Sequence, residues 1–254
     1  MLLFRNPLEQ FMINELLTIL FPFWEVSLTN IGLYLIMSLV LIVIISQIIL
    51  GSTGGVPIIG NKSILIKQSI YDTVHKIVKD QIGISHEINL PFLYTLFILV
   101  LTLNLIGIIP YNYSTTSHLV LTLSMSVSIL IGVTVMGVNR HKLVFFSLLI
   151  PGGTPLGLVP LLVIIETISY LARAISLGVR LGANMIAGHV LLKILAGLIL
   201  KIMKTSLITG LIIGCLPMFI FTLLVGLELG ISVLQGIVFL ILTSSYIKDA
   251  IALH

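Results

Sequence analysis

One uninterrupted apolar stretch constrains this chain more than any other feature. From about Leu156 to about Lys204 no strong helix breaker occurs, and most residues are apolar. As a helix, roughly 48 residues would extend ~70 Å, which is more than twice the ~30 Å hydrocarbon core of a bilayer. The stretch must therefore break into two spans or lie far more tilted than the ~20° that is usual for membrane helices.

The composition places the chain in a membrane. Of its 254 residues, 58% are hydrophobic and 9% are charged, whereas soluble domains carry about 25% charged residues. Water-soluble enzyme folds are thereby excluded. The apolar stretches are too continuous for the alternating strands of a membrane β-barrel, so helices must satisfy the backbone hydrogen bonds. We expect an all-α integral membrane protein in which the single cysteine, Cys215, is a small packing residue.

We expect a single membrane domain over residues 1–254, with three roughly perpendicular spans, one surface helix and a long, strongly tilted antiparallel helical hairpin. The first span covers 26–50, a helical hairpin covers 90–138, and the tilted hairpin covers 156–248. The segment 63–80 differs, because its apolar residues recur at steps of four, four and three between charged ones. This pattern predicts an amphipathic helix on the membrane surface. Its apolar residues are Ile66, Ile70, Val74 and Ile77.

Charge asymmetry predicts the orientation of the spans. If they cross as expected, the basic residues between them fall on one side, whereas the turn at 111–117 carries no charge. The basic side would be the matrix in a mitochondrion or the cytoplasm in a bacterium. The N-terminus has the pattern of neither a secretory signal nor a transit peptide, so an organellar version would be made inside the organelle. The basic residues are Lys62, Lys67, Lys76, Lys79, Arg140 and Lys142.

Arg180 is the most informative residue of the long stretch. Its guanidinium stays charged at physiological pH, and placing it at membrane depth costs at least ~2.5–3.5 kcal/mol. At ~100° per residue it belongs to a polar stripe about 40° wide. The stripe consists of Glu166, Arg173, Arg180 and Asn184. His189 points about 180° away from Arg180.

The last helix supplies a second polar set. If the hairpin turns near 206–207, three polar pairs face each other: Arg180 with Gln235, His189 with Glu228, and Glu166 with Asp249. Histidine and buried carboxylates exchange protons near neutral pH after modest pKa shifts, whereas arginine keeps its proton. A fixed cation between two titratable clusters would block direct proton passage and favour the ionised form of a passing carboxylic acid. The pattern therefore suits proton transfer.

The ten residues from Arg180 to His189 closely resemble the signature of subunit a of the rotary F-type ATP synthase. The resemblance covers roughly residues 90–254 and is specific, because several separate motifs occur in the order of the family. The further motifs are 104–110, 145–147 with 151–155, 164–170 and 245–250. His189 together with Glu228 resembles the mitochondrial version, and the surrounding sequence looks fungal. Gly182 and Ala183 depart from the bulkier residues often found there.

The resemblance implies two long helices that lie almost flat against a ring of c subunits. Arg180 would face the ring carboxylate, with His189 and Glu228 in the half-channel from the intermembrane space and Glu166 and Asp249 in the half-channel to the matrix. Arg173, Asn184 and Gln235 would have supporting roles. The implied partners are the c-ring, other membrane-sector and peripheral-stalk subunits, lipids and protons, and the implied location is the mitochondrial inner membrane. Neither a cofactor nor nucleic acid is expected.

Several residues also have simpler interpretations. Arg173 suits a structural ion pair with Glu166, and Asp249 suits a solvated chain end. Gln235 suits an ordinary interhelical hydrogen bond. Asn104 and His118 are typical of polar groups at the ends of spans. The spacing of His86, Glu87 and His254 does not indicate a metal site.

Two other classes of function were compatible with a buried arginine. One is a secondary transporter or anion channel that uses Arg180 to bind its substrate, although the sequence contains no inverted repeat. The other is an assembly scaffold without conduction, against which the buried titratable residues argue. The sequence has no Gly-rich phosphate loop followed by Lys and Ser or Thr, so no nucleotide site is expected.

Overall fold

The computed structural model describes residues 10–20, 25–51, 62–83, 88–109, 112–142, 144–145, 156–204 and 207–251. Outside this part of the chain lie the motif at 151–155, His86, Glu87 and His254. The chain divides into two compact units. Unit 1 combines Met1–Val43, Leu99–His118 and Leu181–Gln235; unit 2 combines Ile44–Ile98, Leu119–Arg180 and Gly236–His254.

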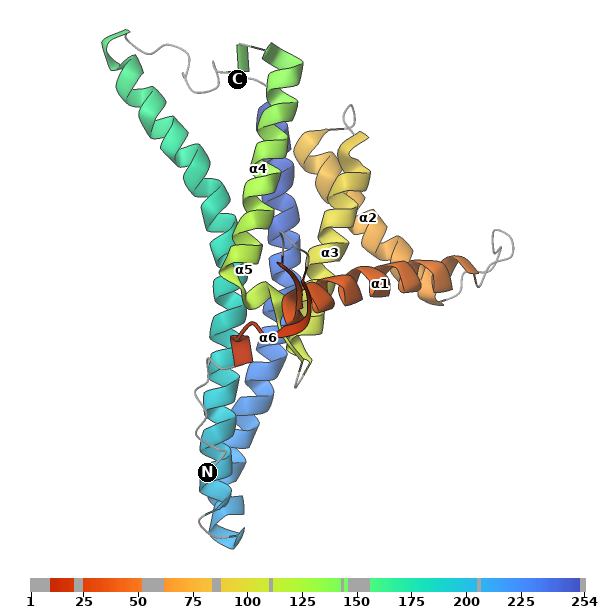
Figure 1. Ribbon diagram of the computed structural model, residues 1–254, viewed down its shortest axis with the longest axis vertical. Coiled ribbons are helices and arrows are strands. Elements are labelled where there is room, and N and C mark those ends of the chain that lie inside the picture. Colours follow the sequence, from red (N-terminus) through yellow and green to blue (C-terminus); the bar gives the residue numbers. More distant parts are fainter. Residues whose placement is uncertain are drawn as a thin grey trace. The chain divides into compact units, whose positions relative to one another are not determined.

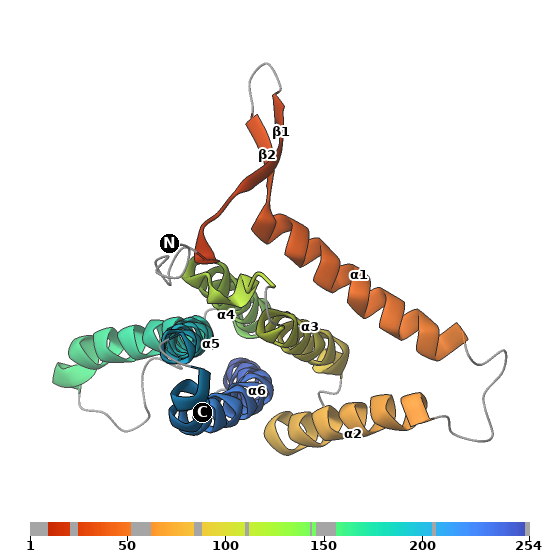
Figure 2. The same cartoon turned by 90° about the horizontal axis from the view of Figure 1, so that it is seen from below.

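Helices dominate the described residues (Figures 1 and 2). Within the part of the chain that was described, four helices are long and apolar enough to cross a membrane. They are Leu90–Ile108, Leu119–His141, Val159–Met203 and Gly214–Ile251. The expectation of a helical integral membrane protein is therefore confirmed.

The N-terminal region adds a β-hairpin that the sequence analysis did not predict. Strand β1 (Glu15–Leu20) pairs antiparallel with β2 (Glu25–Thr29), and Figure 2 shows both next to α1. The first helix, α1 (Asn30–Gly51), consequently begins four residues later than the expected start at Val26. Thr29 caps the helix, because its hydroxyl oxygen accepts a hydrogen bond from the backbone N–H of Gly32 at 3.5 Å. The side-chain oxygen of Asn30 accepts a hydrogen bond from the backbone N–H of Asn14 at 3.3 Å and ties the start of the helix to the hairpin region.

Helix α2 (Lys62–Ile82) contains the amphipathic segment expected at 63–80. Its Val74 and Val78 are buried with 1% exposure, whereas Leu65 and Ile66 are exposed. The helix ends at Gly83, which has a φ of +89° and donates its N–H to the carbonyl of Lys79 at 3.0 Å. A left-handed glycine after the last turn is a common way to end a helix.

Helices α3 (Leu90–Ile108) and α4 (Leu119–His141) occupy the predicted hairpin segment. A short 3₁₀ helix, η4 (Thr115–Ser117), precedes α4. Helix α4 continues three residues beyond the expected end at residue 138. Arg140 and His141 fall in its last turn, where cationic side chains suit the helix dipole, and a ring nitrogen of His141 lies 3.0 Å from the carbonyl oxygen of Ile251.

The two longest helices are α5 (Val159–Met203) and α6 (Leu207–Ile251), each of 45 residues. The apolar stretch therefore does not break into two helices, and Pro217 lies inside α6. At 1.5 Å per residue each helix extends ~68 Å. Within unit 1, the segments 181–203 and 207–235 lie side by side in both views (Figures 1 and 2).

Candidate functional site

Arg180 lies on α5, in the part of that helix that belongs to unit 2. Its side chain is exposed, and among the described residues no hydrogen bond or ion pair to it is formed. Neighbouring positions of this segment are tightly packed, because Ala174 and Leu177 are each only 1% exposed. The arginine is therefore carried by a well-packed segment of α5.

A close contact between α4 and α5 positions this segment. A Cβ atom added to Gly178 would lie 2.5 Å from the hydroxyl oxygen of Ser126 and 2.8 Å from the backbone oxygen of Thr122. Both distances are shorter than real Cβ contacts, so α4 approaches α5 here only because residue 178 lacks a side chain. The contact lies two residues before Arg180 and fixes the helix that carries it.

The structure brings His189 and Glu228 together in unit 1. Nδ1 of His189 lies 3.8 Å from Oε1 of Glu228, and the two side chains are 17% and 7% exposed. Both carboxylate oxygens of Glu228 and Nε2 of His189 lack a hydrogen-bond partner among the described residues. Since 3.8 Å is too long for a direct hydrogen bond, a water molecule could bridge the two groups. The ring of Phe11 covers the imidazole edge-on, with centroids 6.4 Å apart.

Gly188 makes room for the carboxyl group. A Cβ atom at this position would lie 2.7 Å from Oε1 and 3.0 Å from Cδ of Glu228. The carboxyl group therefore lies directly against the backbone of α5, next to the histidine. The particular neighbour of Gly188 could not be read from the sequence.

Unit 1 also contains a buried polar row on α6. Glu228, Ser232 and Gln235 follow one another at steps of four and three and are all buried, so they share one helix face. Asn184 donates its side-chain N–H to Oε1 of Gln235 at 3.2 Å. The predicted neighbourhood of Gln235 and Arg180 joins residues of different units and stays a prediction.

Asn104 was interpreted as a polar group at the end of a span, and this interpretation was wrong. Its side chain is fully buried, and it donates a hydrogen bond to the backbone oxygen of Ser232 at 3.3 Å. Asn104 thereby links α3 to the polar row of α6 within unit 1. Its place inside an otherwise apolar helix, four residues before the end of α3, was the signal that could have indicated such a role.

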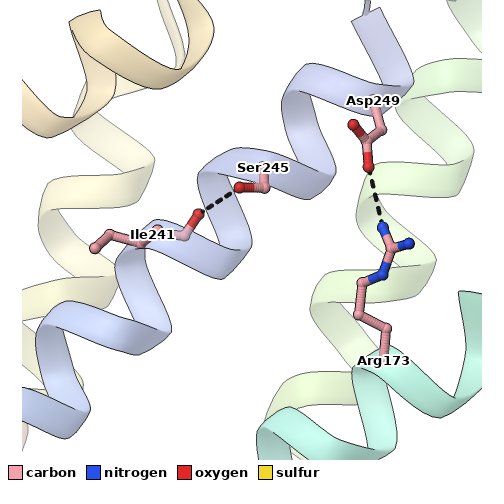
Figure 3. Close-up of polar contacts among 4 residues, drawn as sticks. All are labelled: Arg173, Ile241, Ser245 and Asp249. Atoms are coloured by element: carbon pink, nitrogen blue, oxygen red, sulfur yellow. Dashed lines mark hydrogen bonds and ion pairs between the residues drawn. The ribbon is translucent and has the colours of Figure 1, made fainter.

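In unit 2, Arg173 forms an ion pair with Asp249, with 3.1 Å between Nη1 and Oδ2 (Figure 3). Both side chains are partly exposed, at 40% and 38%. The guanidinium carbon of Arg173 lies 5.9 Å from the ring centroid of Tyr246, within the range of a cation–π contact. Figure 3 also shows Ser245, which donates its hydroxyl to the carbonyl of Ile241 at 3.0 Å.

Glu166 was the expected neighbour of Asp249 and, in the simpler interpretation, the expected ion-pair partner of Arg173. The structure instead joins Arg173 and Asp249, and no ion pair of the half-buried Glu166 is formed among the described residues. The physical reason is that a contact between two helices depends on their relative axial position, which a single sequence does not contain, whereas the expected pair of Arg173 and Glu166 lies within α5 alone. Asp249 therefore lies beside an opposite charge, with its side chain still 38% exposed.

Comparison with known proteins agrees with the motifs. Residues 32–248 match the family described as "ATP synthase A chain". The chain is 49% identical over 253 residues to ATP synthase subunit a of Podospora anserina, with 98% of this chain and 94% of the relative covered. It is 46% identical to the protein of that name from Mycosarcoma maydis, with 99% of each covered, and 42% identical to that from Saccharomyces cerevisiae, with 98% and 96% covered.

Proposed function

Because the chain belongs to the ATP synthase A chain family, whose members form the proton-translocating stator of the membrane sector, we propose that its two long helices carry protons through two separate half-channels. The chain is a multi-pass subunit of ATP synthase in the mitochondrial inner membrane. Family membership sets aside the alternatives of a secondary transporter and of a scaffold without conduction. The observation that carries the proposal is the separation of the polar residues into two clusters, one in each unit.

The first cluster forms the half-channel from the intermembrane space. His189 and Glu228 can each take up and release a proton; their side chains are only 17% and 7% exposed, and their polar atoms include ones without a hydrogen-bond partner in the described part of the chain. Such groups favour hydration of the site, because a buried unpaired polar atom is costly. A proton would pass from Glu228 and His189 toward the ring, with Asn184 and Gln235 holding the neighbouring part of α5 and α6 together.

The second cluster forms the half-channel to the matrix. Asp249 is 38% exposed and held by Arg173, and Glu166 is half-buried on the same helix as Arg173. Carboxylates at such positions can accept a proton from the ring and release it to water. In this interpretation Arg173 keeps the Asp249 carboxylate in one orientation.

Arg180 separates the two half-channels. The exposed guanidinium, without a partner among the described residues, is free to pair with a carboxylate on another subunit. We assign that partner to the c-ring. Because arginine does not give up its proton, protons could not cross directly and would be carried round by the ring. Its charge would also promote release of the proton from each arriving carboxylic acid.

The lengths of α5 and α6 support a steeply tilted hairpin against the ring. An upright helix of ~68 Å would project far beyond a ~30 Å hydrocarbon core, yet apolar side chains are exposed along both helices, from Leu161 to Leu200 and from Leu216 to Leu234. Tilting keeps these side chains within the membrane. In the same arrangement α2 lies on the membrane surface and the three earlier spans are roughly perpendicular to it.

Substitution of the arginine tests the proposal. In the assembled ATP synthase, Arg180→Ala should abolish proton-driven ATP synthesis, while a native gel still shows the complete complex. Lys201→Ala, on the exposed last turn of α5, serves as the matched control and should keep synthesis near normal. Near-normal synthesis by Arg180→Ala would overturn the proposal.

A further inference from the structure

Unit 2 contains two tyrosine hydroxyls that the half-channel proposal does not use. Tyr246 is 2% exposed and Tyr170 is half-buried. Neither hydroxyl has a hydrogen-bond partner among the described residues. A buried hydroxyl without a partner is unfavourable, and polar sites of this kind are usually completed by water. A hydroxyl group at these two positions is therefore not explained by packing alone, because phenylalanine would fill nearly the same space.

Both hydroxyls belong to the surroundings of the Arg173–Asp249 pair. Arg173, Asp249 and Tyr246 all interact electrostatically with the hydroxyl of Tyr170, and the guanidinium of Arg173 lies over the ring of Tyr246. On α5 the tyrosine precedes the arginine by three residues, and on α6 the other tyrosine precedes the aspartate by three. Side chains three residues apart share a helix face. Each helix thus presents one phenol and one charged group to the same cluster.

The cluster changes from exposed to buried along its length. Arg173 and Asp249 are 40% and 38% exposed, whereas Tyr246 is almost completely buried. The ion pair is therefore the most accessible part of the cluster, and Tyr246 is its buried part. This gradient gives the cluster the form of a polar path rather than of an isolated surface ion pair.

We infer that the hydroxyls of Tyr170 and Tyr246 bind water beside the Arg173–Asp249 pair and form the inner part of the path by which protons leave toward the matrix. This inference rests on the proposed half-channel. A phenol both donates and accepts a hydrogen bond. In one transfer it accepts the excess proton from a protonated inner water, which is left as neutral water, and gives its own proton to an outer water or to the carboxylate of Asp249, so the phenol itself is unchanged. Asp249 then releases the proton to bulk water.

Arg173 would direct this transfer. It cannot take the proton itself, and it holds Oδ2 of Asp249 at 3.1 Å, which leaves the second carboxylate oxygen to accept the proton. The role of the two tyrosines is therefore distinct from the role of the ion pair: the phenols conduct, and Arg173 orients the acceptor.

The test removes only the hydroxyl oxygens. Tyr170→Phe and Tyr246→Phe, alone and combined, are introduced into the assembled ATP synthase and reconstituted in vesicles. ATP-driven proton pumping and proton-driven ATP synthesis are measured in H₂O and in D₂O. The double variant should lower both rates at least about fivefold and change the solvent isotope effect, while assembly on a native gel stays normal. Tyr71→Phe, on the exposed face of α2 in the same unit, is the control.

The outcomes separate this inference from the proposed function. Wild-type rates and an unchanged isotope effect in the double variant would overturn the inference, while loss of synthesis in Arg180→Ala would still support the half-channels. A slower double variant with an unchanged isotope effect would also overturn it, because that result indicates altered packing alone. If the double variant fails to assemble, the single variant Tyr170→Phe decides by the same two readouts, since Tyr170 is the less buried phenol.

Discussion

Nδ1 of His189 and Oε1 of Glu228 lie 3.8 Å apart across the interface of α5 and α6, close to each other but not directly hydrogen-bonded. The glycine that precedes the histidine sets this geometry, because the carboxyl group of Glu228 occupies the space where a Cβ atom of residue 188 would stand. The proton-accepting groups of the pair are therefore placed by the missing side chain of Gly188 as much as by their own helices.

Gly188→Ala should impair function more than stability. The added Cβ atom would stand 2.7 Å from Oε1 of Glu228, and the end of a flexible side chain can move away from it. We expect a normally assembled complex whose rate of proton-driven ATP synthesis is reduced several-fold, because the carboxyl group shifts relative to His189. The rate is measured in reconstituted vesicles at saturating ADP and phosphate.

Gly197→Ala is the matched control for this substitution. Residue 197 lies on the same helix, and no atom comes within 4 Å of a Cβ atom added there. Alanine is favoured over glycine inside a helix by about 0.8–1.0 kcal/mol, so this variant should assemble and synthesise ATP normally. Equal rates in the two variants would contradict the assigned role of Gly188.

Gly178→Ala, unlike Gly188→Ala, should impair stability and assembly more than function. Here the added Cβ atom would meet backbone atoms of α4, 2.8 Å from the carbonyl oxygen of Thr122, and these atoms cannot rotate away. Overpacking of this kind costs about 1–3 kcal/mol, so the amount of assembled subunit should fall, as measured by quantitative native gels. Removing the nearby hydroxyl with Ser126→Ala should not restore assembly, whereas Gly132→Ala, with open space around it, should have no effect.

Glu228→Gln tests the charge of the buried pair. Glutamine keeps the shape of the side chain but cannot exchange a proton, so we expect proton-driven ATP synthesis to fall about tenfold or more. Glu228→Asp retains the carboxyl group and should keep a larger part of the rate. A double-mutant cycle with His189→Gln measures whether the two groups act as a unit; strictly additive losses would show that they act independently.

The helices and the contact of His189 with Glu228 could be predicted from the sequence, because both follow from helical periodicity and an antiparallel hairpin. Long apolar runs indicate helices without reference to the rest of the fold, and the ~100° repeat places His189 on the opposite side of α5 from Arg180. The neighbourhood of His189 and Glu228 followed from assuming an antiparallel hairpin, and the structure shows this pair together.

Other features depend on contacts between distant segments, which a single sequence does not contain. The N-terminal strands pair with each other, and the side chain of Asn30 accepts a hydrogen bond from the backbone of Asn14, just before β1. The interrupted apolar pattern of this region did not indicate a hairpin. The partner of Arg173 was expected on its own helix, at Glu166, whereas the structure places it on α6, at Asp249. The burial of the Tyr246 hydroxyl likewise becomes visible only in three dimensions.

The segment before α4 should respond to pH through His118. Burial lowers the pKa of His118 below its ordinary value of 6.5, and the neutral ring accepts a hydrogen bond from the hydroxyl of Tyr113, whose ring stacks on that of Tyr34. Burial likewise raises the pKa of Tyr113 above 10.0, so the phenol remains a donor at neutral pH.

If residues 112–118 opened, the pKa of His118 would return to about 6.5, and the opened state would bind more protons than the closed state. The contribution of His118 to the stability of the closed state is therefore complete above about pH 6.5. This contribution is lost as the pH falls through the lower pKa of the closed state. Hydrogen exchange of amides 112–118, corrected for the intrinsic pH dependence, should therefore show weaker protection at about pH 5.5 than at about pH 7.5. His118→Gln should remove the difference; equal protection at both pH values in the unmodified chain would refute this prediction.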